Sequence, residues 1–217
     1  MPDLILNADA APDGAPAVQR AYLPVATAIV TGDLAAGTMI TEGEVSTILG
    51  MSRTPVREAF LLLEARGLLR LYPKKGALVT AIDDAEVRDL LEARIMLEST
   101  AARTAADRGD TARLGSELAR LLDEQRRAAA SDDLLAFAHA DHLFHARVVE
   151  EARNGVFDEI YDSLGPRFER VTHRIVARDA ARLAEFISQH EQLAQLIATG
   201  RSHEYEPALR THVMPLG

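Results

Sequence analysis

The sequence predicts a mostly α-helical protein: an N-terminal winged helix-turn-helix with a small β wing, followed by an all-helical bundle of about six helices. A helix with clear end signals begins near Ser52, and two short strand-like runs come after it around a basic turn. From residue 83 onward the chain is rich in Ala, Leu, Glu and Arg. We expect a flexible N-terminal arm (1–17), a winged helix-turn-helix domain (18–82) and a helical domain (83–217).

The arm is expected because residues 1–17 are rich in Ala, Pro, Asp and Gly and show no periodicity. Further along, the stretch 44–49 has helical character and ends at the short turn Gly50-Met51. A second helix comes next, with Ser52 as a predicted N-cap whose hydroxyl accepts from the first turn. Pro55 stands in that turn, where a missing N–H costs little, and Gly67 suits a left-handed residue after the helix. Two helices across a tight corner form a helix-turn-helix.

Apolar residues recur along the second helix at three- and four-residue spacing and predict a face that packs on a core: Val56, Ala59, Phe60 and Leu63. Arg53, Thr54 and Arg57 then point outward near its N-terminus, where an arginine can donate two hydrogen bonds to O6 and N7 of guanine. We expect Glu58 to orient Arg57. The alternative is that these arginines are ordinary solubilising charge.

A small wing is predicted after this helix. Residues 68–72 and 77–80 have the composition of short strands, and Pro73-Lys74-Lys75-Gly76 makes a basic turn between them. The lysines of this turn are expected to reach DNA phosphates or the minor groove. They are the only lysines in the protein.

The distribution of charge favours DNA binding by this region alone. The chain has a net charge of −9 and a pI near 5.3, which by itself argues against nucleic acid. Residues 51–76 nevertheless hold six basic and two acidic side chains, a local charge of +4 that leaves −13 on the rest. Arg66 lies in this basic segment and is a further candidate DNA contact.

Composition excludes several classes of protein. There is no cysteine, so disulfides and thiolate metal sites are excluded. There is no apolar run long enough to span a bilayer and no signal-peptide pattern. We expect a cytoplasmic protein that does not contact a membrane.

The helical domain is expected to begin after Asp83 or Asp84, either of which can cap a helix. Gly and Asp signals divide the remaining sequence. The predicted helices span residues 84–107, 110–130, 132–153, 155–177, 180–199 and 203–213.

Four residues of this domain are candidate metal ligands. Asp141 and His145 are four apart, so they share one face of a predicted helix, and His190 and His212 lie on two others. Three neutral imidazoles and a carboxylate suit zinc, or nickel or a similar divalent ion, and leave coordination positions for water or an organic acid. The alternative is that they are surface or core-edge polar residues. The remaining histidines are expected to be structural or solvent-facing: His139, His142, His173 and His203.

The sequence also resembles a known family. The motifs that carry the resemblance in the first half are Gly32-Asp33-Leu34, Gly37-Thr38, Glu42, residues 52–59, Leu63, Gly67-Leu68-Leu69, Lys75-Gly76 and Val79. They resemble the winged-helix domain of GntR-family bacterial transcription regulators. In the second half, the motifs are Arg94-x-x-x-Glu98, Asp141-x-x-Phe144-His145, Asn154, His190 and His212. They resemble the helical ligand-binding domain, called FCD, of the fatty-acid-regulator-like subfamily.

The resemblance implies roles for particular residues. It implies DNA contacts by Arg53, Thr54 and Arg57, a wing tip formed by Lys75 and Gly76, and a metal ion held by the four candidate ligands. It also implies a homodimer that binds a short palindromic operator and releases it when a small carboxylate binds. Two positions depart from the family pattern. Gly43 stands where some relatives have a basic DNA contact, and little helix remains after His212 to support it.

Arg94 resembles the arginine that lines the effector pocket in relatives, and its planar fork suits a carboxylate. The alternative is that Arg94 pairs with Glu98, four residues on.

Together these observations predict a sequence-specific DNA-binding transcription regulator. A repressor is expected, with activation as the alternative. A metal-dependent enzyme acting on a small organic acid is a second hypothesis, because a histidine-rich centre with open positions can activate water. Against it, no spacing such as His-Glu-x-x-His is present and the basic winged segment stays unexplained. A third hypothesis is a helical scaffold protein whose histidines have no functional role.

Overall fold

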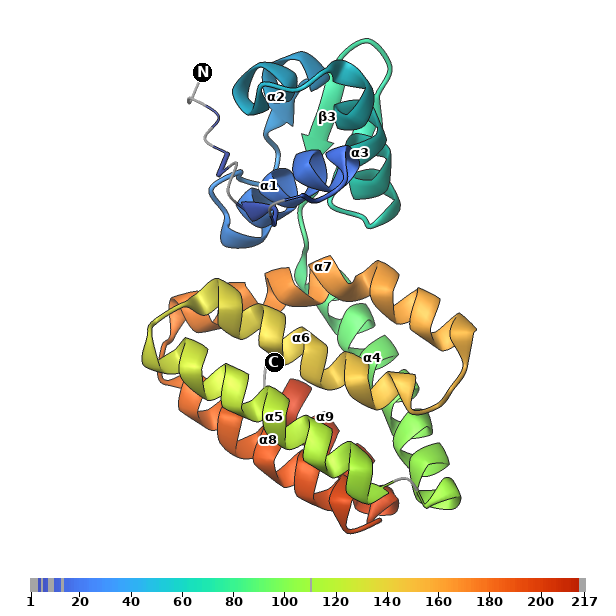
Figure 1. The fold of residues 1–217 in the computed structure, drawn as a ribbon. Helices are drawn as coiled ribbons and strands as arrows, with labels where there is room; N and C mark the ends of the chain where they lie inside the picture. The colour runs from blue at the N-terminus through green and yellow to red at the C-terminus, as the bar shows by residue number, and fades with distance from the viewer. Residues whose placement is uncertain (1–3, 5, 8–9, 13, 110, 215–217) are drawn as a thin grey trace. The chain divides into compact units, whose positions relative to one another are not determined.

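The computed structural model of the chain describes residues 4, 6–7, 10–12, 14–109 and 111–214, which form two compact units, Met1–Ile82 and Asp83–Gly217 (Figure 1). Part of the predicted arm (residues 1–3, 5, 8–9 and 13) lies outside the described residues. Within the described part of the arm, Leu4 and Leu6 pack against the core of the first unit.

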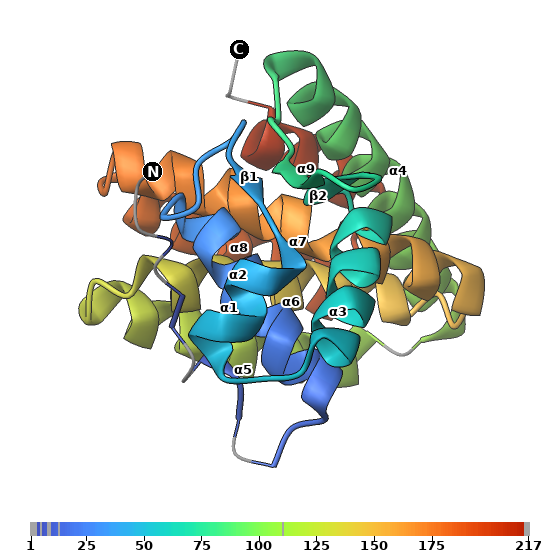
Figure 2. The same ribbon diagram turned by 90° about the horizontal axis from the view of Figure 1, so that it is seen from above.

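The first unit has the predicted winged helix-turn-helix (Figures 1 and 2). Its elements are α1 (Ala17–Thr31), β1 (Met39–Ile40), α2 (Glu42–Leu49), α3 (Arg53–Ala65), β2 (Leu69–Tyr72) and β3 (Gly76–Val79). The sheet has the order β1-β3-β2, and both pairings are antiparallel. The sequence did not indicate β1, because two residues are too few to show an alternating pattern.

The helix-turn-helix corner depends on the starts of its two helices. Thr41 and Glu44 form a reciprocal capping box at the start of α2, which was not predicted from the sequence. Ser52 has the extended backbone of an N-cap, but its hydroxyl makes no hydrogen bond to the first turn, so that prediction was wrong. The reason lies at Pro55, which stands at N3 and has no N–H for a capping hydroxyl to bind.

The predicted apolar face of α3 is confirmed. Its four members are at most 1% exposed and join one core with α1 and the sheet: Val56, Ala59, Phe60 and Leu63. Gly67 has φ 74°, the left-handed conformation predicted for the residue that ends this helix. Burial of this face orients the opposite side of α3 toward solvent.

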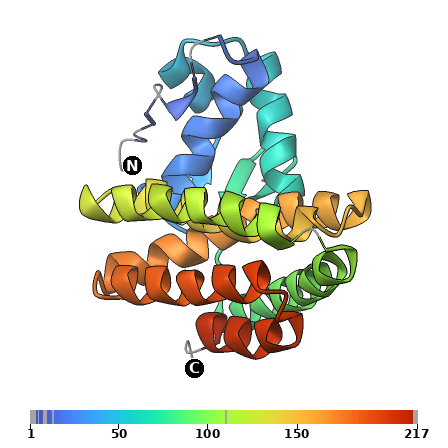
Figure 3. The ribbon, with the colours of Figure 1, turned by 60° about the horizontal axis from the view of Figure 1, so that its bottom comes forward.

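The second unit confirms the helical bundle. In residues 83–109 and 111–214 its helices are α4 (Asp84–Arg108), α5 (Thr111–Ala130), α6 (Leu134–Glu150), α7 (Gly155–Arg178), α8 (Arg182–Ala198) and α9 (Ser202–Val213). The side chain of Asp83 accepts from Glu86 N and caps α4 as expected. Helix α6 packs between α5 and α7, and α8 packs on α5 (Figure 1). Helix α9 lies beside α4 and α8 (Figure 3). None of the described helices combines the length and apolar character needed to cross a membrane.

Candidate functional site

The N-terminal end of α3 presents a cationic surface. Arg53, Thr54 and Arg57 are all exposed on the side opposite the buried face. Among the described residues, neither Arg53 nor Arg57 forms an ion pair, so the orienting contact expected between Glu58 and Arg57 is absent. Both guanidinium groups therefore keep their donors available for an external acceptor.

The wing tip adds two exposed lysines. Lys74 has φ 64° and Lys75 is next to it in the turn between β2 and β3. Gly76 has φ 108°, and a Cβ atom there would lie 2.4 Å from the carbonyl oxygen of Ile40 in β1. The close approach of β1 therefore requires glycine at this position, independently of any DNA contact.

Arg66 lies at the opposite end of α3 from the cationic surface. It is half-buried, and its guanidinium carbon lies 5.6 Å from the ring centroid of Tyr22. Gly43, by contrast, adjoins the cationic surface, because a Cβ atom there would lie 3.5 Å from Nη2 of Arg53. The guanidinium of Arg53 thus lies beside the position where some relatives carry a basic residue.

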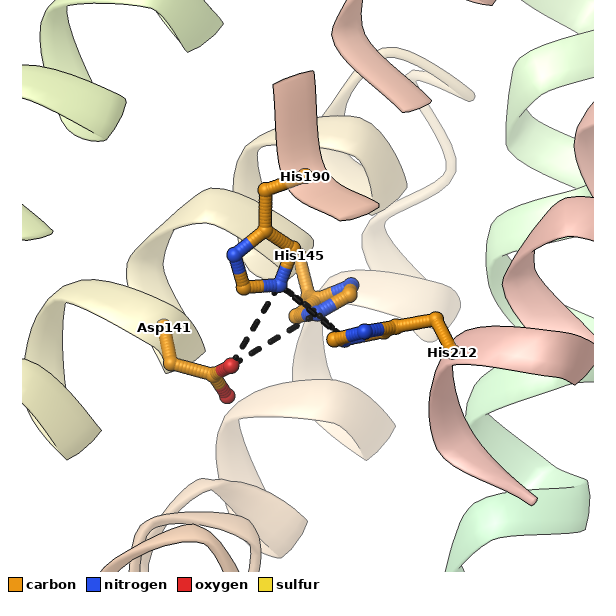
Figure 4. Close-up of side chains that lie close together, drawn as sticks. All are labelled: Asp141, His145, His190 and His212. Atoms are coloured by element: carbon orange, nitrogen blue, oxygen red, sulfur yellow. Dashed lines mark hydrogen bonds and ion pairs between the residues drawn. The ribbon is translucent and has the colours of Figure 1, made fainter. Parts of the chain in front are cut away.

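The four candidate metal ligands come together inside the helical unit (Figure 4). Asp141 and His145 extend from α6, His190 from α8 and His212 from α9, and all four are buried. The three Nε2 atoms lie 3.0, 3.1 and 3.3 Å from one another. Oδ1 of Asp141 lies 3.4 Å from Nε2 of His190 and 3.9 Å from Nε2 of His145.

A second layer of side chains orients each imidazole. The Nδ1 atoms face oxygen acceptors on other helices, at 2.7 Å in each pair: His145 with Glu98 Oε2, His190 with Gln125 Oε1, and His212 with Gln189 Oε1. These acceptors assign the proton of each ring to Nδ1. Every Nε2 lone pair then faces the centre of the cluster.

The titration of the cluster favours neutral imidazoles. Burial holds the pKa values of His145, His190 and His212 well below the ordinary value of 6.5. Burial raises the pKa of Asp141 to about 6 and that of Glu98 to about 8, while Arg94 opposes both shifts. Positive charge near these carboxyls lowers their pKa values, so a cation at the centre of the cluster would favour the ionised form of both Asp141 and Glu98.

The donor set fits a divalent metal ion. Metal–nitrogen bonds of about 2.0–2.1 Å at angles near 90–109° place neighbouring nitrogens about 2.9–3.4 Å apart, which spans the three separations found here. Three lone pairs directed at one point repel each other unless a cation or a proton lies between them. Neutral rings with Nδ1 held by an oxygen are typical of metal-binding histidines.

Arg94 lies beside the cluster on α4, with its side chain 4% exposed. Its Nη1 atom lies 3.6 Å from Oδ2 of Asp141, and its Nε atom 3.7 Å from Oε1 of Glu98. The guanidinium carbon stacks 4.4 Å from the ring centroid of Phe168. Arg94 therefore pairs with Glu98, as one interpretation of the sequence expected, and it also faces the metal-ligand cluster, while its contact with an effector stays a prediction.

Three supporting residues were missed by sequence reasoning. Glu98 was considered only as a partner of Arg94, and Gln125 and Gln189 carried no spacing signal. His212 lies near the end of α9, and residues of α8 support it there. Its Nδ1 atom is bonded to Gln189, and its ring packs against the ring of Phe186. His142 turns away from the cluster as expected and stacks on Tyr161, with ring centroids 5.6 Å apart.

Comparisons with known proteins identify the family of both units. A model of bacterial regulatory proteins of the gntR family matches residues 17–79, and a model of the FCD domain matches residues 89–214. An uncharacterized HTH-type transcriptional regulator of Streptomyces ambofaciens is 29% identical over 194 residues, covering 88% of this chain and 80% of that protein. A Paenarthrobacter nicotinovorans protein described as "Probable D-xylose utilization operon transcriptional repressor" is 30% identical, covering 85% and 80%. The structure of Escherichia coli McbR/YncC has the same fold, with a TM-score of 0.76 at 20% identity over 93% of this chain and 95% of that one.

Proposed function

The chain belongs to the GntR family of bacterial transcriptional regulators with a C-terminal FCD domain, and we propose that a small carboxylate, bound beside a divalent metal ion, controls its affinity for operator DNA. The family assignment makes the protein a DNA-binding regulator and rules against the metalloenzyme hypothesis. The metal, the effector and the response to them constitute the proposal.

One observation carries the metal part of the proposal: the three Nε2 atoms converge while each Nδ1 atom is bonded to a different helix. Asp141, His145, His190 and His212 would hold the ion, with zinc expected and nickel as the alternative. When bound, the ion supplies positive charge and open coordination positions for a carboxylate. Arg94 would bind the same carboxylate through its guanidinium.

The position of the cluster supports a regulatory role. Its ligands and their partners come from every helix of the unit: Glu98 (α4), Gln125 (α5), Asp141 and His145 (α6), Thr172 (α7), Gln189 and His190 (α8), and His212 (α9). A metal ion bound to this cluster would contact three of these helices directly and the other three through a single hydrogen bond to one of its ligands. It can therefore favour one packing of the bundle over another by its differential affinity.

We propose that two copies of the chain bind the operator DNA together. Arg53, Thr54 and Arg57 would enter the major groove, and Lys75 would contact the backbone from the wing. We propose a homodimer whose two α3 helices bind half-sites of a palindromic operator about one helical turn apart. Release on effector binding is the expected response, and a cytoplasmic location agrees with access to the operator.

A titration of operator DNA tests this function. The operator is selected from random duplexes with the full chain, and its affinity is measured for the metal-free protein, the zinc-loaded protein and the zinc-loaded protein with a carboxylate. A His190→Ala/His212→Ala double variant should lose bound metal and its response to the acid. The matched control replaces His139 and His203, which are exposed and outside the cluster. Full metal content in the first variant, by elemental analysis, would contradict the proposed site.

A further inference from the structure

We infer that two copies of the chain meet through the outer face of α4, with the two α4 helices antiparallel and crossing at Met96. This inference rests on the proposed homodimer and concerns which surface forms it. It comes from exposed apolar side chains on α4 and α7, from the order of charges along α4, and from a groove beside Met96.

The exposed large apolar side chains of the helical unit lie on α4 and α7. In residues 83–109 and 111–214 there are three of them: Met96 is 71% exposed, Val156 62% and Ile160 43%. Phe157, which follows Val156 in the first turn of α7, lines one groove together with Met96. Exposed apolar side chains grouped in this way are typical of a surface that another molecule covers.

The order of residues along the outer face of α4 is complementary to itself. Asp89 and Glu92 precede Met96 by seven and four residues, while Thr100 and Arg103 follow it by four and seven. These spacings place all five on one face of the helix, where four are exposed and Thr100 is half-buried. A two-fold axis at Met96 sets Asp89 of one copy opposite Arg103 of the other. By symmetry this charged pair forms twice.

This order of charges favours a second copy as the molecule that covers the face. An interface between two identical surfaces requires each surface to be complementary to itself. The antiparallel arrangement meets this requirement, whereas a parallel one would place Asp89 opposite Asp89 and Arg103 opposite Arg103. Because each copy has a net charge of −9, association is opposed elsewhere, and apolar area with paired charges at this face offsets that repulsion.

The groove beside Met96 offers room for side chains of the second copy. It has a volume of about 550 Å³, and residues of α4, α7 and α9 line it, with Ile95, Met96 and Phe157 in its apolar part. Arg103 and Glu206 also line it, as an ion pair with atoms 3.6 Å apart. Their side chains are 53% and 42% exposed, so the guanidinium keeps surface for an acid of the second copy.

Cross-linking of the full chain tests this arrangement, because the chain has no cysteine of its own. Met96→Cys sets the two thiols of a dimer opposite each other, so a short bismaleimide should link the copies. Arg103→Cys is the matched control on the same face, since the antiparallel arrangement separates its two thiols by about 21 Å along the helices. Linkage should return when Asp89→Cys and Arg103→Cys proteins are mixed and exchange subunits. Linkage of Arg103→Cys to itself, or none in dimeric Met96→Cys, would overturn the inference.

Charge reversal gives a second measurement, by analytical ultracentrifugation at low salt. Asp89→Arg or Arg103→Asp alone sets like charges opposite each other twice and should raise the dimer dissociation constant about tenfold. The Asp89→Arg/Arg103→Asp double variant should restore it. Arg126→Asp is the matched control, because Arg126 is 46% exposed and pairs with Glu191 of another helix, as Arg103 does with Glu206.

The outcomes separate the interface from the dimer itself. A double variant that dimerises as weakly as the single variants would contradict the pairing of Asp89 with Arg103. A dimer that neither charge reversal weakens would overturn the inferred face while leaving the homodimer intact. An unsubstituted protein that stays monomeric would instead overturn the proposed homodimer.

Discussion

The Nδ1 atom of His145 lies 2.7 Å from Oε2 of Glu98, and both side chains are fully buried. The hydroxyls of Tyr161 and Tyr205 also donate to this carboxyl, at 3.2 and 3.0 Å. Glu98 therefore links the inner side of α4 to the ligands on α6 and to two further helices. A carboxylate behind a histidine fixes the ring orientation and increases its basicity toward a metal.

Glu98→Gln should lower zinc affinity by about 10–100-fold, because the neutral amide cannot support His145 as the carboxylate does. Competition with a chromophoric chelator measures the affinity. Glu169→Gln is the matched control, since Glu169 bonds the exposed His139 at 2.8 Å in the same way but outside the cluster. Equal zinc affinities in the two variants would show that Glu98 does not support the site.

Arg57→Ala should weaken binding to the selected operator by about 1–3 kcal/mol, if Arg57 contacts a base through its free guanidinium. Fluorescence anisotropy at fixed salt measures the loss against specific and random duplexes. Arg20→Ala removes another exposed arginine of the same unit and should have little effect. A loss that is identical for specific and random DNA would assign Arg57 to phosphate contact instead.

Gly76→Ala should destabilise the sheet by about 1–3 kcal/mol, since the new Cβ meets the Ile40 carbonyl and the backbone φ of 108° disfavours alanine. Hydrogen exchange at residues 39–40 and 76–79 should report faster opening. Gly43→Ala is the control, because a Cβ fits there at an ordinary contact distance and the position is helical. Unchanged protection in Gly76→Ala would refute the role of this close approach.

Glu151 joins α5 and α6 through hydrogen bonds from Arg113 and Arg147 at 2.6–2.8 Å. Burial alone raises the pKa of Glu151, but these bonds outweigh it and hold the pKa below the ordinary value of 4.5. The ionised group therefore stabilises the fold above pH 4.5, and this contribution is lost as the pH falls through the lowered pKa.

Glu151→Gln should accordingly cost about 1–3 kcal/mol at pH 7, and its difference from the unsubstituted protein should shrink in more acidic solution. Urea denaturation across this pH range measures both effects. Glu159→Gln, at an exposed position without an ion pair among the described residues, should behave like the unsubstituted protein at every pH. A constant difference at all pH values would exclude the titration of Glu151 as its source.

Local sequence signals were sufficient to predict the winged helix-turn-helix, the helical bundle and the family. Periodic apolar residues defined the buried face of α3, and Asp83 and Gly67 marked helix ends through their own backbone preferences. The candidate ligands were also recognisable, since Asp141 and His145 share a helix and the family motif supplied the other two histidines. Local signals failed at Ser52, where a proline removed the N–H that a cap would bind.

The side chains that support those ligands, and the groups that remain free beside them, became apparent only from the packed helices. Glu98, Gln125 and Gln189 bond the imidazoles across 47, 65 and 23 residues of sequence, and no spacing rule spans such separations. The unpartnered donors of Arg94 likewise arise from the packing of several helices. Helix periodicity constrains neighbours within a few turns, whereas burial and hydrogen-bond satisfaction depend on every helix that surrounds the site.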